Sequence, residues 1–210
     1  MGQLISGING HIRGKIGTVI GSSWKGIPYV KGPYKKRTAK VGINEAGNRN
    51  KFSMTHNWLK PLLKFVRVGF KGYTPRVEGF NAAKSCMLLY AFEGVAPDWQ
   101  INPALAKLSF GTLPLSNNIA VEKTALGQLT FTWDTAFVQD GHAKDQAMLL
   151  AYDVEHAKAY YTTIGQFRSA GTDILNTDPT PGKTWHIYFA FSAADRSRQS
   201  DSVYLGTIMM

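Results

Sequence analysis

Apolar and polar residues alternate between about residue 17 and residue 34, a pattern typical of β-strands. The segments GTVIGSSW and IPYVKGPY read as two strands, and Lys25-Gly26 between them can supply the positive φ of a tight hairpin turn. Pro28 lacks a backbone donor, so the second strand is predicted at a sheet edge or a bulge. The apolar, glycine-rich residues 1–12 form a strand only if another segment pairs with them.

The apolar spacing becomes helical between residues 44 and 71. Pro61 is expected to kink this helix, or to end it and start another. A second helix is predicted over residues 78–92, in the segment EGFNAAKSCMLLYAF.

From Leu105 onward the chain reads as short strands, beginning with KLSFGTLP, that recur every 8–12 residues or so. About seven alternating strands in such a length are typical of an immunoglobulin-like or fibronectin type III-like β-sandwich. Trp133 is a candidate core residue, and the strand WHIYFAFSA should place four apolar side chains on one face: Trp185, Ile187, Phe189 and Phe191. The fold class predicted is α+β. Residues 1–104 should form a basic region of hairpin and helices, and residues 105–210 a β-sandwich domain.

The net charge of +10 is unevenly distributed along the chain. Residues 1–76 hold 15 basic residues and one acidic residue, Glu45, whereas residues 77–210 hold 9 basic and 13 acidic residues. This division favours either binding of a polyanion by the first half or head-to-tail association of copies.

The motifs of common enzymes are missing. The glycines at 14, 17 and 21 fit neither a Walker loop nor a dinucleotide fingerprint, and the five histidines lack metal-binding spacing. The single cysteine, Cys86, lies among apolar residues and is expected to be an inert buried thiol. The carboxylates Asp134, Asp140 and Asp145 do not match a calcium loop and are interpreted as solvated. We therefore expect no catalytic residues, no cofactor, no metal and no small-molecule substrate.

Two sets of candidate residues remain. The hairpin is too small to be stable alone, so its apolar side chains are candidates for contact with another copy of the chain. These assembly candidates are Ile16, Val19, Ile20, Trp24, Ile27, Tyr29 and Val30. Basic residues, some interleaved with tyrosines, are the alternative candidates for binding a nucleic acid. They are Lys31, Lys35, Lys36, Arg37, Lys40, Lys60, Lys64 and Arg67.

The sequence contains no run of about 18 apolar residues, so no membrane span is predicted. The N-terminus lacks the pattern of a Sec signal peptide. The localisation expected is therefore cytoplasmic, in a phage particle, or reached by a non-classical export route.

Three stretches together resemble an uncharacterised domain family widespread in Bacteroidota and their phages. They are GINGHIRGKIGTVIGSSWKGIPYVK, GFNAAKSCMLLYAFEG, and DILNTDPTPGKTWHIYFAFSAAD with SVYLGTI. The chain departs from the family's tyrosine-rich acidic middle segment, because it has VAPDWQINPALAK there. The resemblance implies an arrangement of elements and no activity.

The function predicted from these patterns is that of a non-enzymatic structural protein. It would assemble with itself, through its N-terminal strand and hairpin, into a filament, a tube or a phage-like particle. The alternative is a nucleic-acid-binding protein that uses the basic N-terminal half. A carbohydrate-binding or adhesion module is a third reading, suggested only by analogy with other sandwiches.

Overall fold

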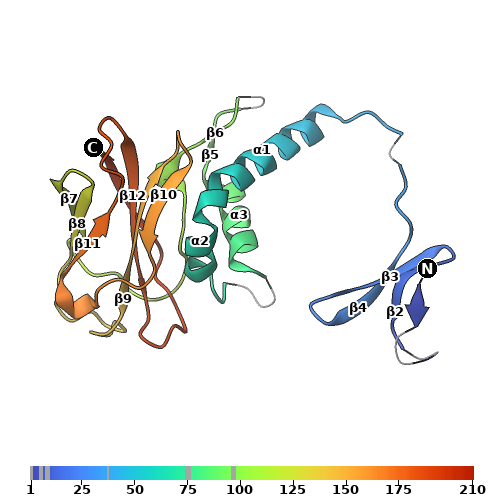
Figure 1. Cartoon of the computed structure of the whole chain (residues 1–210), viewed down its shortest axis with the longest axis horizontal. Coiled ribbons are helices and arrows are strands. Elements are labelled where there is room, and N and C mark those ends of the chain that lie inside the picture. Colours follow the sequence, from blue (N-terminus) through green and yellow to red (C-terminus); the bar gives the residue numbers. More distant parts are fainter. Residues whose placement is uncertain (1, 5–6, 8–9, 37, 74–76, 96–97) are drawn as a thin grey trace. The chain divides into compact units, whose positions relative to one another are not determined.

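The structure is a computed structural model that describes residues 2–4, 7, 10–36, 38–73, 77–95 and 98–210. The chain divides into two compact units, Met1–Gly42 and Ile43–Met210 (Figure 1). The boundary lies far from residue 104, where the sequence pattern predicted it. The physical reason is the packing of the helices, described below.

The first unit is an antiparallel sheet of four strands in the order β1-β2-β3-β4. Their bounds are β1 Gln3–Leu4, β2 Ile12–Ile16, β3 Val19–Trp24 and β4 Ile27–Lys31. The predicted hairpin is confirmed, because Lys25 and Gly26 have φ angles of 50° and 80° between β3 and β4. Pro28 lies on β4, which is an edge strand as predicted.

The second unit begins with its helices, α1 Ile43–Leu59, α2 Leu63–Gly69 and α3 Gly79–Tyr90. A short 3-10 helix at Lys60–Leu62 separates α1 from α2, so the expected interruption occurs at Pro61. Two strands, β5 Phe92–Glu93 and β6 Gln100–Ile101, pair after α3, and a 3-10 turn follows at Pro103–Leu105.

The remaining strands form two antiparallel sheets. One sheet has the order β11-β8-β7, with β7 Ala120–Ala125, β8 Gln128–Thr132 and β11 Thr172–Asn176. The other has the order β10-β9-β12-β13, with β9 Gln146–Asp153, β10 Lys158–Thr162, β12 Thr184–Ser192 and β13 Val203–Met209. The fold is thus a mixed one of helices and antiparallel sheets, and the finer prediction of an immunoglobulin-like sandwich stays a prediction.

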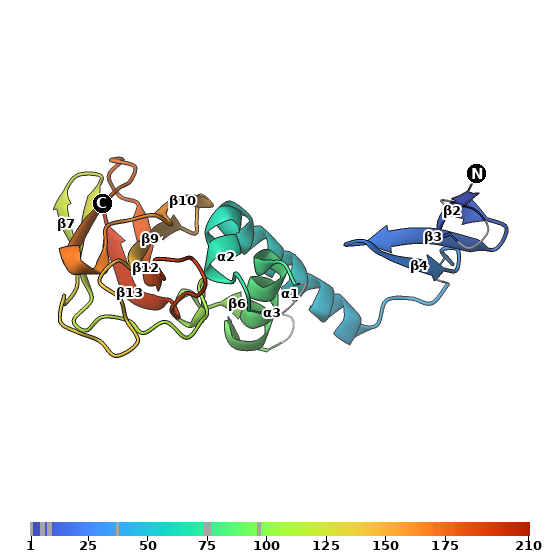
Figure 2. The ribbon, with the colours of Figure 1, turned by 90° about the horizontal axis from the view of Figure 1, so that it is seen from below.

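Alternate side chains of β9 and β12 belong to two different hydrophobic clusters, one on each face of the sheet. Leu149, Ile187 and Phe189 pack with Leu129 and Phe131 of the smaller sheet. Leu150 and Tyr188, on the other face, pack with the helices, which lie on that side of the sheet (Figures 1 and 2). The four-stranded sheet is therefore covered on both faces, which is why both strands are almost wholly apolar.

This packing explains the position of the unit boundary. Leu59, Leu62, Phe65 and Val66 are fully buried in the cluster that the helices share with the sheet. A division near residue 104 would separate the helices from the surface that buries them. The predicted strand KLSFGTLP is also wrong, because residues 107–114 form no strand in the structure.

Candidate functional site

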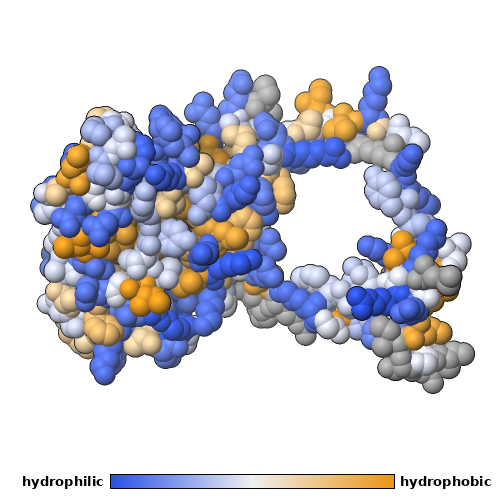
Figure 3. Space-filling view, in the orientation of Figure 1, coloured by the Kyte–Doolittle hydropathy of each residue, from blue (hydrophilic) through white to orange (hydrophobic). Residues whose placement is uncertain are grey.

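Two surfaces of the chain are candidates for function, one in each unit. The first is the sheet of residues 1–42, where the assembly candidates lie. Both hydrophobic clusters found among the described residues are built from residues 58–210, so this sheet contributes to neither. Trp24 and Val30 are each 56% exposed, and Figure 3 shows hydrophobic side chains at the surface of both units.

The strand register divides the assembly candidates between the two faces of this sheet. Residues paired across antiparallel strands point to the same side. Ile16 pairs with Val19, and Gly21 with Val30, whereas Trp24 pairs with Ile27. Ile16, Val19 and Val30 therefore lie on one face, and Ile20, Trp24, Ile27 and Tyr29 lie on the other.

The face of Ile16, Val19 and Val30 is apolar, and we call it the apolar face. Ile12 of β2 belongs to it, because a Cβ added at Gly21 would lie 2.6 Å from the Ile12 Cβ. Leu4 pairs with Ile12 and joins the same face. Leu4, Ile16 and Val30 are exposed, so this face remains in contact with solvent.

The opposite face combines aromatic and basic side chains, and we call it the basic-aromatic face. Lys15 and Lys31 both pair with Ile20, one from each neighbouring strand. Tyr29 pairs with Ser22 and lies diagonally across from Trp24. The register therefore brings two cations and two exposed aromatic rings to one face.

The polyanion candidates are divided between the two units. Lys31, Lys35, Lys36 and Lys40 belong to the first unit, and Lys60, Lys64 and Arg67 are exposed residues of the second. Arg37 lies outside the described residues. Lys60 and Lys64 are four residues apart around the start of α2, so they lie on one side of that segment.

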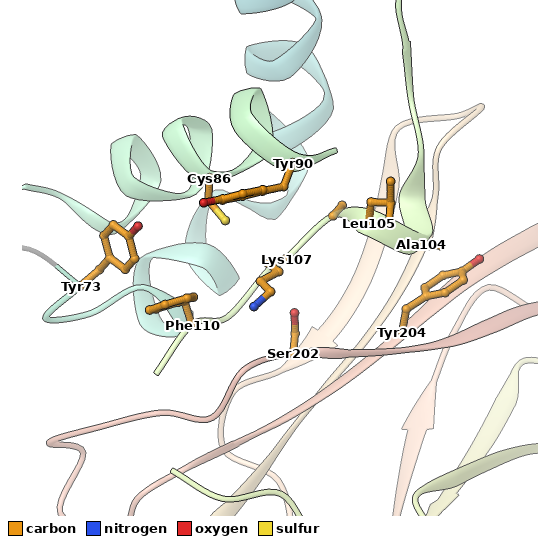
Figure 4. Close-up of a pocket in the computed structure, with 10 residues that line it drawn as sticks. Tyr73, Cys86, Tyr90, Ala104, Leu105, Lys107, Phe110, Ser202 and Tyr204 are labelled. Carbon is orange, nitrogen blue, oxygen red and sulfur yellow. The ribbon is translucent and has the colours of Figure 1, made fainter. Parts of the chain in front are cut away.

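The second candidate surface surrounds a cavity of about 530 Å³ beside α3 (Figure 4). Its lining comes from four segments of the chain, one of which lies about 90 residues after the other three. Tyr73 follows α2, Cys86 and Tyr90 come from α3, residues 104–110 form one wall, and Ser202 and Tyr204 lie at the start of β13. Figure 4 shows the rings of Tyr73, Tyr90 and Phe110 around it.

Hydrogen bonds hold the wall of residues 107–111 in place. Phe110 N–H donates to the Gly69 carbonyl at 2.9 Å, and Ser109 Oγ donates to the Ser200 carbonyl at 2.7 Å. Leu108 N–H donates to Ser202 Oγ at 2.9 Å. A Cβ at Gly69 would lie 2.4 Å from the Leu108 carbonyl oxygen, so only glycine permits this close approach.

The polar groups of the cavity neutralise one another. Lys107 Nζ lies 2.6 Å from Asp201 Oδ2, and this hydrogen bond raises the pKa of Lys107. Burial raises the pKa of the Cys86 thiol, which keeps it protonated at neutral pH, and the expected burial of this cysteine is confirmed. The cavity lining therefore combines a neutralised ion pair, a protonated thiol and several aromatic rings. Such a lining can contact an apolar group.

The interpretation of Asp145 as a solvated carboxylate is wrong. Asp145 is 1% exposed and lies 3.2 Å from the guanidinium of Arg168, which is buried as well. Arg168 also donates to Ser116 Oγ and to the Pro114 carbonyl, and its backbone carbonyl accepts from Trp133 Nε1 at 2.8 Å. Desolvation lowers the pKa of Arg168, while Asp145 favours its charged form. This network is structural, and it fixes Trp133 in the core as predicted.

No local pattern predicts the cavity, because its lining residues come together only through tertiary packing. Within the described residues, no group of three histidine, cysteine or acidic side chains is arranged to hold a metal ion. None of the helices in the described part of the chain is long and apolar enough to span a membrane.

Residues 11–206 match the model of a family of unknown function (DUF6266), and the chain belongs to that family. The resemblance to an uncharacterised family is thereby confirmed. No curated protein and no solved structure matches the chain.

Proposed function

We propose that this protein is a non-enzymatic structural subunit that assembles with copies of itself, head to tail, through its N-terminal sheet. The observation that carries the proposal is the apolar face of that sheet. Its exposed side chains have no cluster of their own in the described part of residues 1–42. A single-layer sheet needs a second layer to bury one face, and another copy of the chain can supply it.

The partner surface proposed is the rim of the cavity in the second unit of another copy. Exposed aromatic and aliphatic side chains are gathered along its lining and at the end of α3, around the ion pair of Lys107 with Asp201. They are Tyr73, Leu89, Tyr90, Leu105 and Phe110. Apolar surfaces that remain exposed in an isolated chain commonly mark sites of association.

Charge supports the orientation. Residues 1–42 contain eight basic and no acidic residues, whereas residues 43–210 hold 16 basic and 14 acidic residues, a net charge of +2. Like charges disfavour contact between two first units, whereas the second unit of the next copy offers carboxylates to the basic first unit. Because the two surfaces differ, the contact is heterologous and repeats, giving a ring if it closes and a filament or tube if it does not.

For the second unit we propose a fibronectin type III-like sandwich as the scaffold of the subunit. The support is the strand order: the first, second and fifth of its seven long strands share one sheet, and the other four share the second. In the proposed assembly the sandwich supplies the rigid body and the N-terminal sheet supplies the connection.

Sedimentation velocity over a wide range of concentrations, with negative-stain microscopy, tests the proposal. We expect concentration-dependent oligomers of the whole chain. Val30→Asp places a charge on the apolar face and should give monomers, because burying an unpaired carboxylate opposes association. Ser22→Asp places the same charge on the other face of the same sheet and should leave assembly intact.

A mixing experiment tests the head-to-tail geometry. Tyr90→Asp should also give monomers, by altering the rim of the cavity. An equal mixture of Val30→Asp and Tyr90→Asp copies retains one intact pair of surfaces, so it should form dimers and stop there. A whole chain that stays monomeric at high concentration would overturn self-assembly. A mixture that stays monomeric would overturn the pairing of these two surfaces.

A further inference from the structure

The basic-aromatic face of the N-terminal sheet has a chemistry that self-assembly through the apolar face does not use. This face carries Trp24 of β3 and Tyr29 of β4 toward the hairpin end, and Lys15 of β2 and Lys31 of β4 on either side of Ile20. The four side chains lie on adjacent strands, so they form one continuous surface.

The two aromatic rings are available to a flat ligand. Trp24 is 56% exposed and Tyr29 is 42% exposed, although both are large apolar side chains in a sheet. Lys25 Nζ lies 5.0 Å from the centroid of the Trp24 ring. A cation close to an exposed ring places positive charge beside a stacking surface.

The charge around the rings is of one sign. Residues 1–42 contain eight lysine and arginine residues and no aspartate or glutamate. Tyr34, Lys35 and Lys36 follow shortly after β4 and are exposed, so aromatic and basic residues continue along the chain. A surface of this kind attracts a polyanion over a distance set by the ionic strength.

We propose that the basic-aromatic face binds single-stranded nucleic acid. Bases would stack on Trp24 and Tyr29, and Lys15 and Lys31 would contact the phosphates. A positively charged surface with exposed aromatic rings is the usual platform for single strands, because every base offers a flat face to stack. A duplex hides the faces of its bases, so the rings select the single strand.

This proposal differs from the basic cluster expected from the sequence. It depends on Trp24, Tyr29 and Lys15, which the strand register brings together with Lys31. It does not require Lys60, Lys64 or Arg67, which belong to the second unit. The two faces of one sheet would then serve two partners, another copy of the chain and a nucleic acid.

The first test is fluorescence anisotropy of a labelled oligothymidine with the whole chain, beside a labelled duplex of the same length. We expect the single strand to bind tenfold or more tighter than the duplex at moderate salt. The double variant Trp24→Ala, Tyr29→Ala should weaken single-strand binding by tenfold or more. The pair Trp24→Phe, Tyr29→Phe keeps both rings and should retain most of the affinity.

The second test measures the salt dependence of binding. Replacing Lys15 and Lys31 by glutamine should reduce the slope of log K against log salt by about 1.4, since each phosphate contact contributes about 0.7 for a single strand. Equal binding of single strand and duplex would overturn the proposal, and so would an unchanged affinity after removal of both rings.

Charge variants separate this proposal from the proposed assembly. Val30→Asp, on the apolar face, should abolish oligomers and leave oligothymidine binding by the monomer unchanged within about twofold. Ser22→Asp, beside Tyr29, should weaken binding and leave the oligomers intact. If Val30→Asp removed binding and Ser22→Asp did not, the site would lie on the other face and the proposal would be wrong.

Discussion

The two units of this chain differ in how far they bury their apolar side chains. In residues 43–210, the four-stranded sheet is covered on one face by helices and on the other by a second sheet. In residues 1–42, a sheet of similar strand number keeps Leu4, Ile16, Trp24 and Val30 exposed. Strand formation needs only local alternation and turns, whereas stability needs a second layer. The comparison shows that the first unit forms its strands while leaving exposed the apolar side chains that a second layer would bury.

The largest effect is expected when the two units are expressed as separate fragments. Residues 43–210 expressed alone should unfold cooperatively with the same midpoint as the second unit of the whole chain. Residues 1–42 alone should show no cooperative transition, because four short strands without a second layer bury too little apolar surface. Circular dichroism with thermal unfolding measures both. A cooperative transition in the short fragment would remove the contrast.

Breaking the buried ion pair should have the next largest effect. Asp145→Asn leaves the charge of Arg168 buried without its partner, and should lower the free energy of unfolding by about 3–5 kcal/mol. Urea unfolding followed by tryptophan fluorescence measures this loss. Asp134→Asn, a carboxylate that is not fully buried, is the matched control and should change the free energy by less than about 0.5 kcal/mol.

Gly69→Ala tests the close approach between α2 and the cavity wall. The added Cβ would meet the Leu108 carbonyl at 2.4 Å, so the wall must move. We expect a loss of about 1–3 kcal/mol in the free energy of unfolding. Gly47→Ala in α1 is the control, since a Cβ there meets nothing within 4 Å and should be neutral or stabilising. Equal changes in the free energy of unfolding for the two variants would show that the cavity wall moves aside without cost.

Alkaline pH should destabilise the second unit. Burial raises the pKa of Tyr152 to about 12, and its hydroxyl donates to the Trp58 carbonyl at 2.9 Å. Because the folded pKa lies above the unfolded value of about 10, this contribution is complete below pH 10 or so. It is then lost at up to about 1.4 kcal/mol per pH unit as the pH rises toward 12. Tyr152→Phe should flatten the dependence, as measured by urea unfolding at several pH values.

The smallest effect is expected for an exposed tryptophan of the first unit, which we compare with a buried tryptophan of the second. Trp133 is 5% exposed and donates a hydrogen bond through its indole, so Trp133→Ala should cost about 3–5 kcal/mol. Trp24 is exposed, and Trp24→Ala should change the unfolding free energy of the second unit by less than about 0.5 kcal/mol. Chemical denaturation of both variants measures the difference, and similar losses would contradict the separation of the units.

Local patterns predicted the elements well. Lys25-Gly26 identified the hairpin turn, Pro61 identified the break between α1 and α2, and the run from Trp185 to Phe191 identified a central strand. Each of these signals depends on neighbouring residues alone, so a single sequence contains it.

Features that depend on distant residues were missed. The helices pack on a sheet that lies more than 50 residues further along the chain, and the compact units divide at residue 42 and not near residue 104. Asp145 looked solvated because its partner, Arg168, is 23 residues away. The cavity joins α3 to the start of β13, and the two faces of the N-terminal sheet became distinct only when the strand register was known.

The burial of both faces of β9 and β12 has a consequence for the dynamics of the second unit. These strands belong to both hydrophobic clusters, so neither the helices nor the smaller sheet can detach without exposing them. Their amide hydrogens should exchange with deuterated water only when the whole unit opens. The exchange rate of these amides therefore reports either the rate or the equilibrium constant of global opening of the second unit. In the same sample, the amides of β4 in the first unit should exchange much sooner.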